Sequence, residues 1–187
     1  MKIISGSSNG YFFEGILIDA PNEVTWVSDK IKICVITHEH CDHFAGIKNL
    51  QCEIGASKFC ADTINGKIDK FGLCSLIGFE FPDKKVKRIL RDGDLVKGNE
   101  IELRVLETPG HAKGAICLYA EEKKLLFSGD TIFPDRGMPR VDLPTSEPEK
   151  LRESYEKLAA LEIEKIYPGH GKIIEEKDYL TKILYVL

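Results

Sequence analysis

The placement of the five histidines constrains this chain more than any other feature of its sequence. Three lie within Thr37–His43 (THEHCDH), and the other two are His111 and His170. Each position follows a run of apolar residues typical of a β-strand, and so does Asp130. We therefore expect these side chains to gather along one edge of a sheet. Histidine and aspartate are common metal ligands, so the pattern predicts a metal site at that edge.

Length and composition indicate a globular protein. A chain of 187 residues is long enough for one sizeable domain, and no internal repeat or linker divides it, so we assign residues 1–187 to a single domain. Its residues are 43% hydrophobic and 30% charged, unlike those of a disordered chain. No apolar run approaches the roughly 20 residues that span a bilayer, and residues 1–20 lack the pattern of a signal peptide. We expect a cytoplasmic protein without a membrane partner.

Charge argues against a nucleic-acid partner. The formal net charge is −4, whereas nucleic-acid-binding proteins usually carry a basic face. A short basic run at 84–88 is more typical of a solvated turn than of a binding patch. We expect a small-molecule substrate, and the sequence leaves the oligomeric state open.

Apolar patterning predicts a fold of the α/β class. The expected strands are 2–5, 11–19, 31–37, 86–90, 101–107, 115–120, 124–128 and 163–167, and the expected helices are 43–50, 56–65, one from 146 and one from 175. Asn9-Gly10 is a hairpin signal between the first two strands. Ser146 and Glu149 have the spacing of a capping box, which predicts that a helix begins there.

The histidine cluster can hold more than one ion. Residues two apart in extended backbone point to the same side, so His38 and His40 can bind one metal. Asp42 and His43 lie where the chain turns into a helix, and they can face a second position. Such ligands suit zinc, and also iron or manganese. Cys41 should point to the other side, and we interpret it as a packing residue.

These motifs resemble those of the metallo-β-lactamase fold superfamily, and within it those of glyoxalase II-type hydrolases. The resemblance covers nearly the whole chain, through Asn9, Leu17-Ile18-Asp19, the H-x-H-x-D-H cluster, Thr108-Pro109-Gly110-His111, Ser128-Gly129-Asp130-Thr131 and Pro168-Gly169-His170-Gly171. It implies a four-layer αββα sandwich with the metal site at one end of the two sheets.

The resemblance also implies a dinuclear site, for which zinc is the favoured metal. The first ion would be held by His38, His40 and His111, the second by Asp42, His43 and His170, with Asp130 bridging the two. Asp19 would orient a ligand imidazole, as carboxylates near metal sites often do. The alternative for Asp19 is a turn residue before Pro21.

Two such ions imply hydrolytic chemistry. Ions about 3.5 Å apart can share a hydroxide that attacks a carbonyl or phosphoryl centre, and no serine or cysteine nucleophile is needed. Asp42 and Asp130 are then the expected catalytic residues. Structural zinc sites usually bind the ion with four protein ligands and leave no open position, so a set of seven candidate ligands disfavours a purely structural role.

Two residues are candidates for substrate binding. Arg140 lies in 136–144, which resembles the loop after the bridging aspartate in short glyoxalase II-like proteins, and it is a candidate anion contact. Its alternative is a loop-bracing role. Phe71 lies in 66–82, which we expect to form a wall or lid of the pocket, the alternative being a core-packed insertion. The glutathione-binding helical region of true glyoxalase II enzymes is expected to be missing or reduced, because the sequence ends soon after His170.

The favoured function is hydrolysis of a thioester or related acyl substrate. Two alternatives stay open. A persulfide dioxygenase would use the same cluster with one iron bound by a subset of the ligands. An RNA-processing nuclease would share the fold, although the acidic net charge disfavours it.

Overall fold

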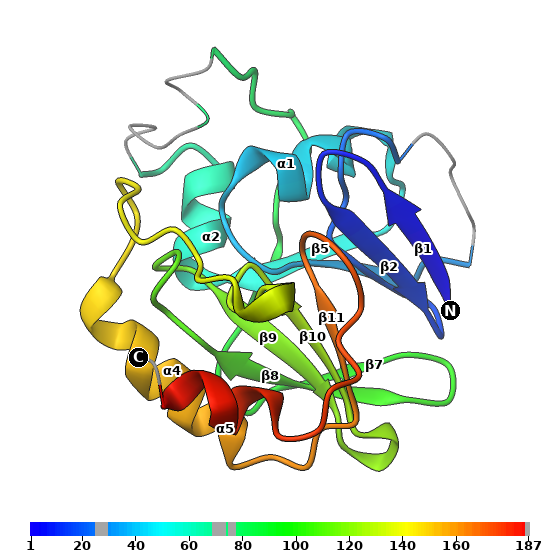
Figure 1. Cartoon of the computed structure of the whole chain (residues 1–187). Helices are drawn as coiled ribbons and strands as arrows, with labels where there is room; N and C mark the ends of the chain where they lie inside the picture. Colours follow the sequence, from blue (N-terminus) through cyan, green and yellow to red (C-terminus); the bar gives the residue numbers. More distant parts are fainter. Residues whose placement is uncertain (25–29, 69–73, 75–77, 186–187) are drawn as a thin grey trace.

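Two β-sheets stacked face to face form the centre of the protein in a computed structural model, which describes residues 1–24, 30–68, 74 and 78–185 (Figure 1). The first sheet has the strand order β1-β2-β3-β4-β5-β6, and the second β11-β10-β9-β8-β7. The strands of the first are Lys2–Ser5 (β1), Asn9–Phe13 (β2), Ile16–Ile18 (β3), Ile33–Ile36 (β4), Glu53–Ser57 (β5) and Arg88–Leu90 (β6). Those of the second are Leu95–Lys97 (β7), Glu102–Glu107 (β8), Ile116–Ala120 (β9), Leu125–Gly129 (β10) and Lys165–Pro168 (β11).

Helices cover the outer face of each sheet. α1 (Cys41–Phe44) and α2 (Lys58–Ile64) pack on the first sheet, while α4 (Leu151–Ala159) and α5 (Tyr179–Leu184) lie side by side on the second (Figure 1). Among the described residues, 3-10 helices occupy the connections Ala45–Asn49, Glu121–Lys123, Pro134–Arg136 and Pro148–Lys150. This is the expected four-layer αββα sandwich. In the part of the chain that is described, no helix is long and apolar enough to cross a membrane.

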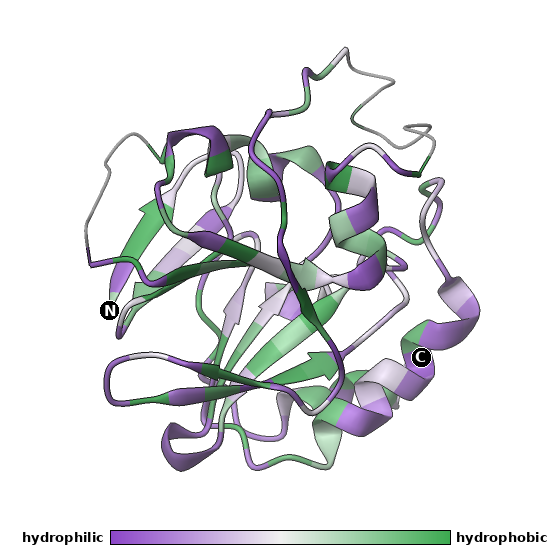
Figure 2. Ribbon diagram, turned by 180° about the vertical axis from the view of Figure 1, so that it is seen from behind, coloured by the Kyte–Doolittle hydropathy of each residue, from purple (hydrophilic) through white to green (hydrophobic). Residues whose placement is uncertain are grey.

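Three hydrophobic cores separate the four layers, and β4 shows how one strand serves two of them. Successive strand residues point to opposite faces. Cys34 and Ile36 therefore pack against the helices, whereas Ile33 and Val35 pack between the sheets. All four are buried, which explains the continuous apolar run in the sequence. Figure 2 shows the same division, with hydrophobic colour on the strands and hydrophilic colour on many loops and on the outer side of the helices.

Strand direction brings the candidate residues to one edge. β3 is parallel to β4, and β10 is parallel to β11. β8 runs in the same direction as β10, because both are antiparallel to β9. The carboxyl ends of these five strands lead into Asp19, Thr37, Thr108, Asp130 and Gly169. The two sheets are joined at this edge, where Ile116 N donates to Thr37 O at 2.9 Å.

Three details of the strands differ from expectation. β5 was not expected, and its last two residues, Ala56 and Ser57, lie in the segment 56–65 that was expected to be a helix. Residues 11–19 form two strands rather than one, because a turn at Glu14 and Gly15, both with positive φ, reverses the chain between β2 and β3. β7 was not expected from the sequence. It is three residues long with only Val96 buried, which is too short to give a clear alternating pattern.

The predicted capping box at Ser146 is wrong. Ser146 Oγ donates to His111 O at 2.7 Å instead of capping a helix. The chain passes through the 3-10 helix Pro148–Lys150, and α4 begins at Leu151 without a side-chain cap. The Ser146 hydroxyl does not cap a helix because its hydrogen bond holds the loop that carries His111 against the segment before α4.

The core between the second sheet and α4 can be tested with Leu158, which is fully buried. Leu158→Ala should lower the free energy of unfolding by about 2–5 kcal/mol, because it removes buried methyl groups and leaves a cavity. Urea denaturation measures the change. Leu95→Ala is the control, since Leu95 is 44% exposed on an edge strand and should shift stability by less than about 0.5 kcal/mol. Equal losses in the two variants would contradict this packing.

Candidate metal centre

Three histidine rings meet at the edge where the two sheets join. His40 Nδ1 lies 3.0 Å from His38 Nε2 and 3.0 Å from His111 Nε2. His38 and His40 follow β4, and His111 follows β8, so both sheets contribute. The three residues are 1%, 5% and 4% exposed, respectively. One metal ion could contact all three nitrogens, because they lie within 4.8 Å of one another.

A second group lies beside the first and faces solvent. His170 Nε2 is 3.1 Å from Asp42 Oδ2, and His43 Nε2 is 3.6 Å from the same oxygen. The side chains of His170 and Asp42 are 34% and 31% exposed, whereas that of His43 is fully buried. A molecule from solvent therefore reaches the centre from the side of Asp42 and His170.

Asp130 lies between the two groups. Its Oδ1 is 3.3 Å from His43 Nε2, and its Oδ2 is 3.4 Å from His170 Nε2 and 3.6 Å from His111 Nε2. One carboxylate thus reaches histidines of both groups. The structure brings together all seven residues proposed as ligands from the sequence; whether they bind metal remains a prediction.

The buried carboxylate of Asp19 orients His43. Asp19 Oδ2 is 2.8 Å from His43 Nδ1, and the same carboxylate accepts from Thr37 N at 2.8 Å and from Thr37 Oγ1 at 2.9 Å. An ionised carboxylate can only accept, so we assign the proton of neutral His43 to Nδ1. Nε2 then directs its lone pair toward Asp42 and Asp130.

His38 and His111 are oriented in the same way. The Thr37 hydroxyl gives its proton to Asp19, so it accepts from His38 Nδ1, 3.1 Å away. His111 Nδ1 donates to Arg140 O at 2.7 Å. In both rings the unprotonated Nε2 faces His40, as a metal ligand requires.

The pKa is lowered for His38 and His40 but raised for His43. Burial lowers the pKa of His40 to about 4, with the neighbouring rings of His111 and His43 adding to the effect. Burial likewise lowers the pKa of His38 well below its ordinary value. Burial also opposes a charge on His43, but Asp130 and Asp19 outweigh it and raise its pKa well above the ordinary value. At His43 Nε2 a proton and a metal ion are therefore alternatives.

Two buried atoms support a cation at the centre. Within the described residues, His43 Nε2 and Asp130 Oδ1 lack hydrogen-bond partners although both are buried. Buried polar atoms without partners are costly, so native proteins seldom leave them so. A divalent ion contacting the imidazole lone pair and the carboxylate would satisfy both atoms. The donor set of nitrogen and carboxylate oxygen fits zinc, iron or manganese.

Glycine is required where the loops approach the centre. A Cβ on Gly169 would collide with Asp130 Oδ1 and would lie 2.6 Å from His43 Cε1. Gly129 has φ +47°, and a Cβ there would lie 2.5 Å from Thr37 Oγ1. These two positions permit the close approach of the loops after β10 and β11.

Sequence reasoning missed three contributors to this geometry. Thr37 orients His38, and it could have been suspected because it directly precedes the cluster. Ser8 Oγ donates to Asp42 O at 2.8 Å, which fixes the backbone of the second group. Arg140 acts on His111 through its carbonyl oxygen, a contact that any residue type can provide and that leaves no sequence signal.

Of the two residues predicted to contact substrate, Arg140 lies in the described part of the chain and Phe71 does not. The Arg140 guanidinium is exposed and pairs with both carboxylate oxygens of Asp142, at 3.0 and 2.8 Å. Its contact with a substrate anion stays a prediction. Phe71 lies outside the described residues. Phe79 and Phe81, from the same segment, pack against Phe44 with ring centroids 5.6 and 5.7 Å away, so this part of 66–82 belongs to the core.

Cys41 is buried in the core between the first sheet and its helices, as the sequence analysis expected for a packing residue.

Comparison with known proteins identifies the family. The model of the metallo-beta-lactamase superfamily matches residues 27–170, which include all seven residues of the centre. The chain belongs to the metallo-beta-lactamase superfamily. A hydroxyacylglutathione hydrolase from Francisella tularensis subsp. novicida (strain U112) is 31% identical over 156 residues, which cover 83% of this chain and 55% of the relative.

An acyl-coenzyme A thioesterase, MBLAC2 of Gallus gallus, is 30% identical over 159 residues, which cover 74% of this chain and 56% of the relative. The chain thus spans about half the length of these two curated relatives. Whether residues 1–187 act as a single domain remains a prediction.

Solved structures support the fold. A metallo-beta-lactamase family protein of Thermus thermophilus, TTHA1429, superposes with a TM-score of 0.74 at 20% identity, covering 96% of this chain and 74% of that one. TTHA1623, solved in a di-iron-bound form, gives a TM-score of 0.73 at 24% identity and covers 93% of each chain. Both confirm the αββα sandwich.

The role of Asp19 can be tested by metal affinity. Asp19 accepts from Thr37 N on Oδ1 and from Thr37 Oγ1 and His43 Nδ1 on Oδ2, whereas Asp19→Asn keeps only one acceptor oxygen, so His43 should lose its fixed orientation. We expect a metal affinity about 10–100-fold weaker, measured by competition with a chromogenic chelator. Asp83→Asn, at an exposed position, should leave affinity unchanged. Unaltered affinity in Asp19→Asn would mean that His43 does not depend on this carboxylate.

Proposed function

We propose that this protein hydrolyses thioesters at a dinuclear metal site formed by the seven residues at the sheet edge. The observation that carries the proposal is the position of Asp130, whose two oxygens reach histidines of both groups at 3.3–3.6 Å. Two relatives support the substrate class, since one is named a hydroxyacylglutathione hydrolase and the other an acyl-coenzyme A thioesterase.

The seven residues would bind two metal ions. His38, His40 and His111 would hold the first ion, Asp42, His43 and His170 the second, and Asp130 both. Bound divalent ions would supply a hydroxide nucleophile at neutral pH and would polarise the thioester carbonyl. We favour zinc, with iron or manganese as alternatives.

Asp42 and Asp130 are the proposed catalytic residues. Burial raises the pKa of Asp42, but the hydrogen bond from His170 and the charge of His43 outweigh it, and the net pKa is lowered. The pKa of Asp130 is held well below its ordinary value, because His43 and His170 outweigh its burial. Both groups are therefore carboxylates at neutral pH and keep their acceptor oxygens directed at the centre.

The function is tested with zinc-loaded and iron-loaded protein. Metal content is measured by mass spectrometry, and thiol release is followed with S-lactoylglutathione and acyl-coenzyme A substrates. Two ions per chain with thiol release would support the proposal. One iron per chain with oxygen uptake on glutathione persulfide would replace it by the dioxygenase. Binding to RNA that weakens steeply with salt, together with RNA cleavage and without thiol release, would replace it by the nuclease.

Asp130→Ala tests the shared carboxylate. Its loss should reduce metal content from two ions toward one or none and lower kcat/KM at least about 100-fold, because both groups lose a ligand. Asp83→Ala, at an exposed position, should keep the metal content and turnover of the unmodified protein. Two ions and normal turnover in Asp130→Ala would refute the bridging role.

A further inference from the structure

An aromatic ring borders the solvent-facing side of the centre. Phe133 follows the loop after Asp130, and its ring is parallel to that of His170, with a 4° angle between the planes and 6.1 Å between centroids. The same ring meets His111 nearly edge-on, with centroids 6.5 Å apart. Phe133 is only partly buried, and His170 is the most exposed histidine of the centre. One ring therefore flanks both metal groups where a substrate must enter.

Tyr179, from the C-terminal helix α5, fixes the turn that carries Phe133. Its hydroxyl donates to Phe133 O at 2.5 Å and accepts from Arg136 N at 2.6 Å. The tyrosine itself is buried in the core beneath the second sheet. One phenol thus holds both ends of the turn 133–136, although α5 contributes no residue to the metal centre.

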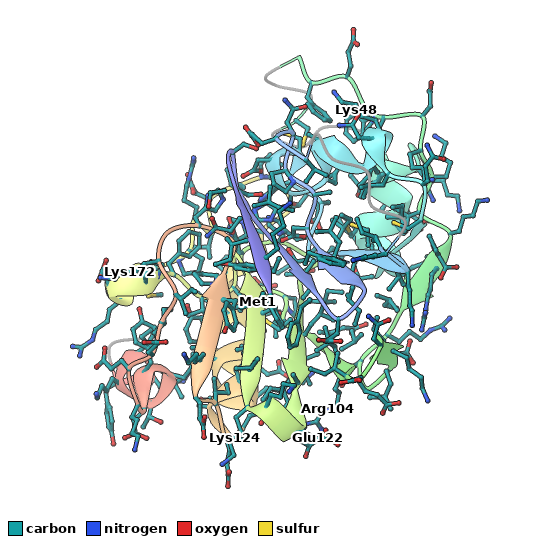
Figure 3. All side chains as sticks on the ribbon, turned by 90° about the vertical axis from the view of Figure 1, so that its right-hand side faces the viewer. Met1, Lys48, Arg104, Glu122, Lys124 and Lys172 are labelled. Atoms are coloured by element: carbon teal, nitrogen blue, oxygen red, sulfur yellow. The ribbon has the colours of Figure 1, made fainter. Side chains whose placement is uncertain are left out.

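The turn needs such support because its backbone is strained. Asp135 and Arg136 both have left-handed φ values, 56° and 57°, which non-glycine residues rarely adopt. Two ion pairs also connect the turn to the C-terminal segment. Lys172, labelled in Figure 3, places its Nζ 2.7 Å from Asp135 Oδ1. Arg136 Nη2 lies 3.2 Å from Glu176 Oε1. These pairs are exposed and therefore weak, so the buried phenol is the stronger constraint.

We propose that Phe133 is a specificity-determining residue that packs against an apolar acyl chain of the substrate, and that Tyr179 is its positioning residue. The proposal rests on the thioesterase function proposed above and names its substrate class: thioesters with extended apolar acyl groups rather than short or polar ones. We assign the acyl chain, rather than the thiol part, of a thioester held at the two groups to the side of the ring that contacts both His111 and His170.

The test uses S-acyl-N-acetylcysteamine thioesters, from acetyl to octanoyl, whose small thiol part is constant. We compare the zinc-loaded protein with Phe133→Ala, Phe133→Leu and Tyr179→Phe. Tyr185→Phe is the matched control, since Tyr185 is 86% exposed just after α5. Metal content is measured for every variant.

The unmodified protein should show kcat/KM rising with acyl length. In Phe133→Ala, kcat/KM for octanoyl should fall roughly tenfold while that for acetyl changes less than about twofold. Phe133→Leu should retain part of the preference. Tyr179→Phe should raise KM for the long chains with little change in kcat, and Tyr185→Phe should change neither. A purely structural role would instead lower kcat for all substrates in parallel, and that result, or an unchanged length dependence in Phe133→Ala, would overturn the proposal.

A separate binding measurement tests the role of Phe133 even if the protein has no thioesterase activity. If no thioester is cleaved, alkanethiols from ethanethiol to octanethiol are titrated into cobalt-loaded protein, and the visible spectrum reports their binding. Affinity that rises with chain length and loses this dependence in Phe133→Ala and Tyr179→Phe supports the apolar wall even though the substrate class is then wrong. Equal length dependence in all variants overturns the wall.

Discussion

The buried carboxylate of Asp19 is the interaction on which the rest of the centre depends. It joins the end of β3 to the end of β4 through Thr37, and it reaches α1 through His43. Asp19 adopts a left-handed conformation with φ 57°, and its own N–H donates to Val35 O at 2.9 Å. The Thr37 hydroxyl in turn accepts from His38, so one carboxylate orients two rings that belong to different groups of candidate ligands.

The sandwich supplies what this local network cannot. His111, Asp130 and His170 come from the second sheet, and they meet the cluster because the strand ends of both sheets share one edge. Packing between the sheets therefore sets the distances between the groups, while hydrogen bonds set the ring orientations. The centre is closed around His38 and His40 and open beside His170. This difference leaves room for substrate on one side without exposing the other.

Most of the fold and all seven candidate ligands could be predicted from the sequence, for a physical reason. Buried strands need continuous apolar runs, and ligands for metals come from few residue types, so residues such as His111 and Asp130 stand out at strand ends. Contacts made by backbone atoms carry no such signal, which is why the role of the Arg140 carbonyl was missed. The capping box at Ser146 failed because the same hydroxyl can bond either to its own helix or to a distant loop. Only the tertiary structure decides between them.

The distance along the chain between the members of the centre has a consequence for folding. Thr37–His43 belong to the first sheet, but His170 follows the last strand of the second, so the centre assembles only through contacts between segments far apart in sequence. Such long-range pairing closes large loops and is slow compared with helix formation. An ion that binds only the assembled centre adds its binding free energy to the folded state alone. Metal binding should therefore act late in folding: it should stabilise chains whose two sheets are correctly packed and should not stabilise partly folded chains.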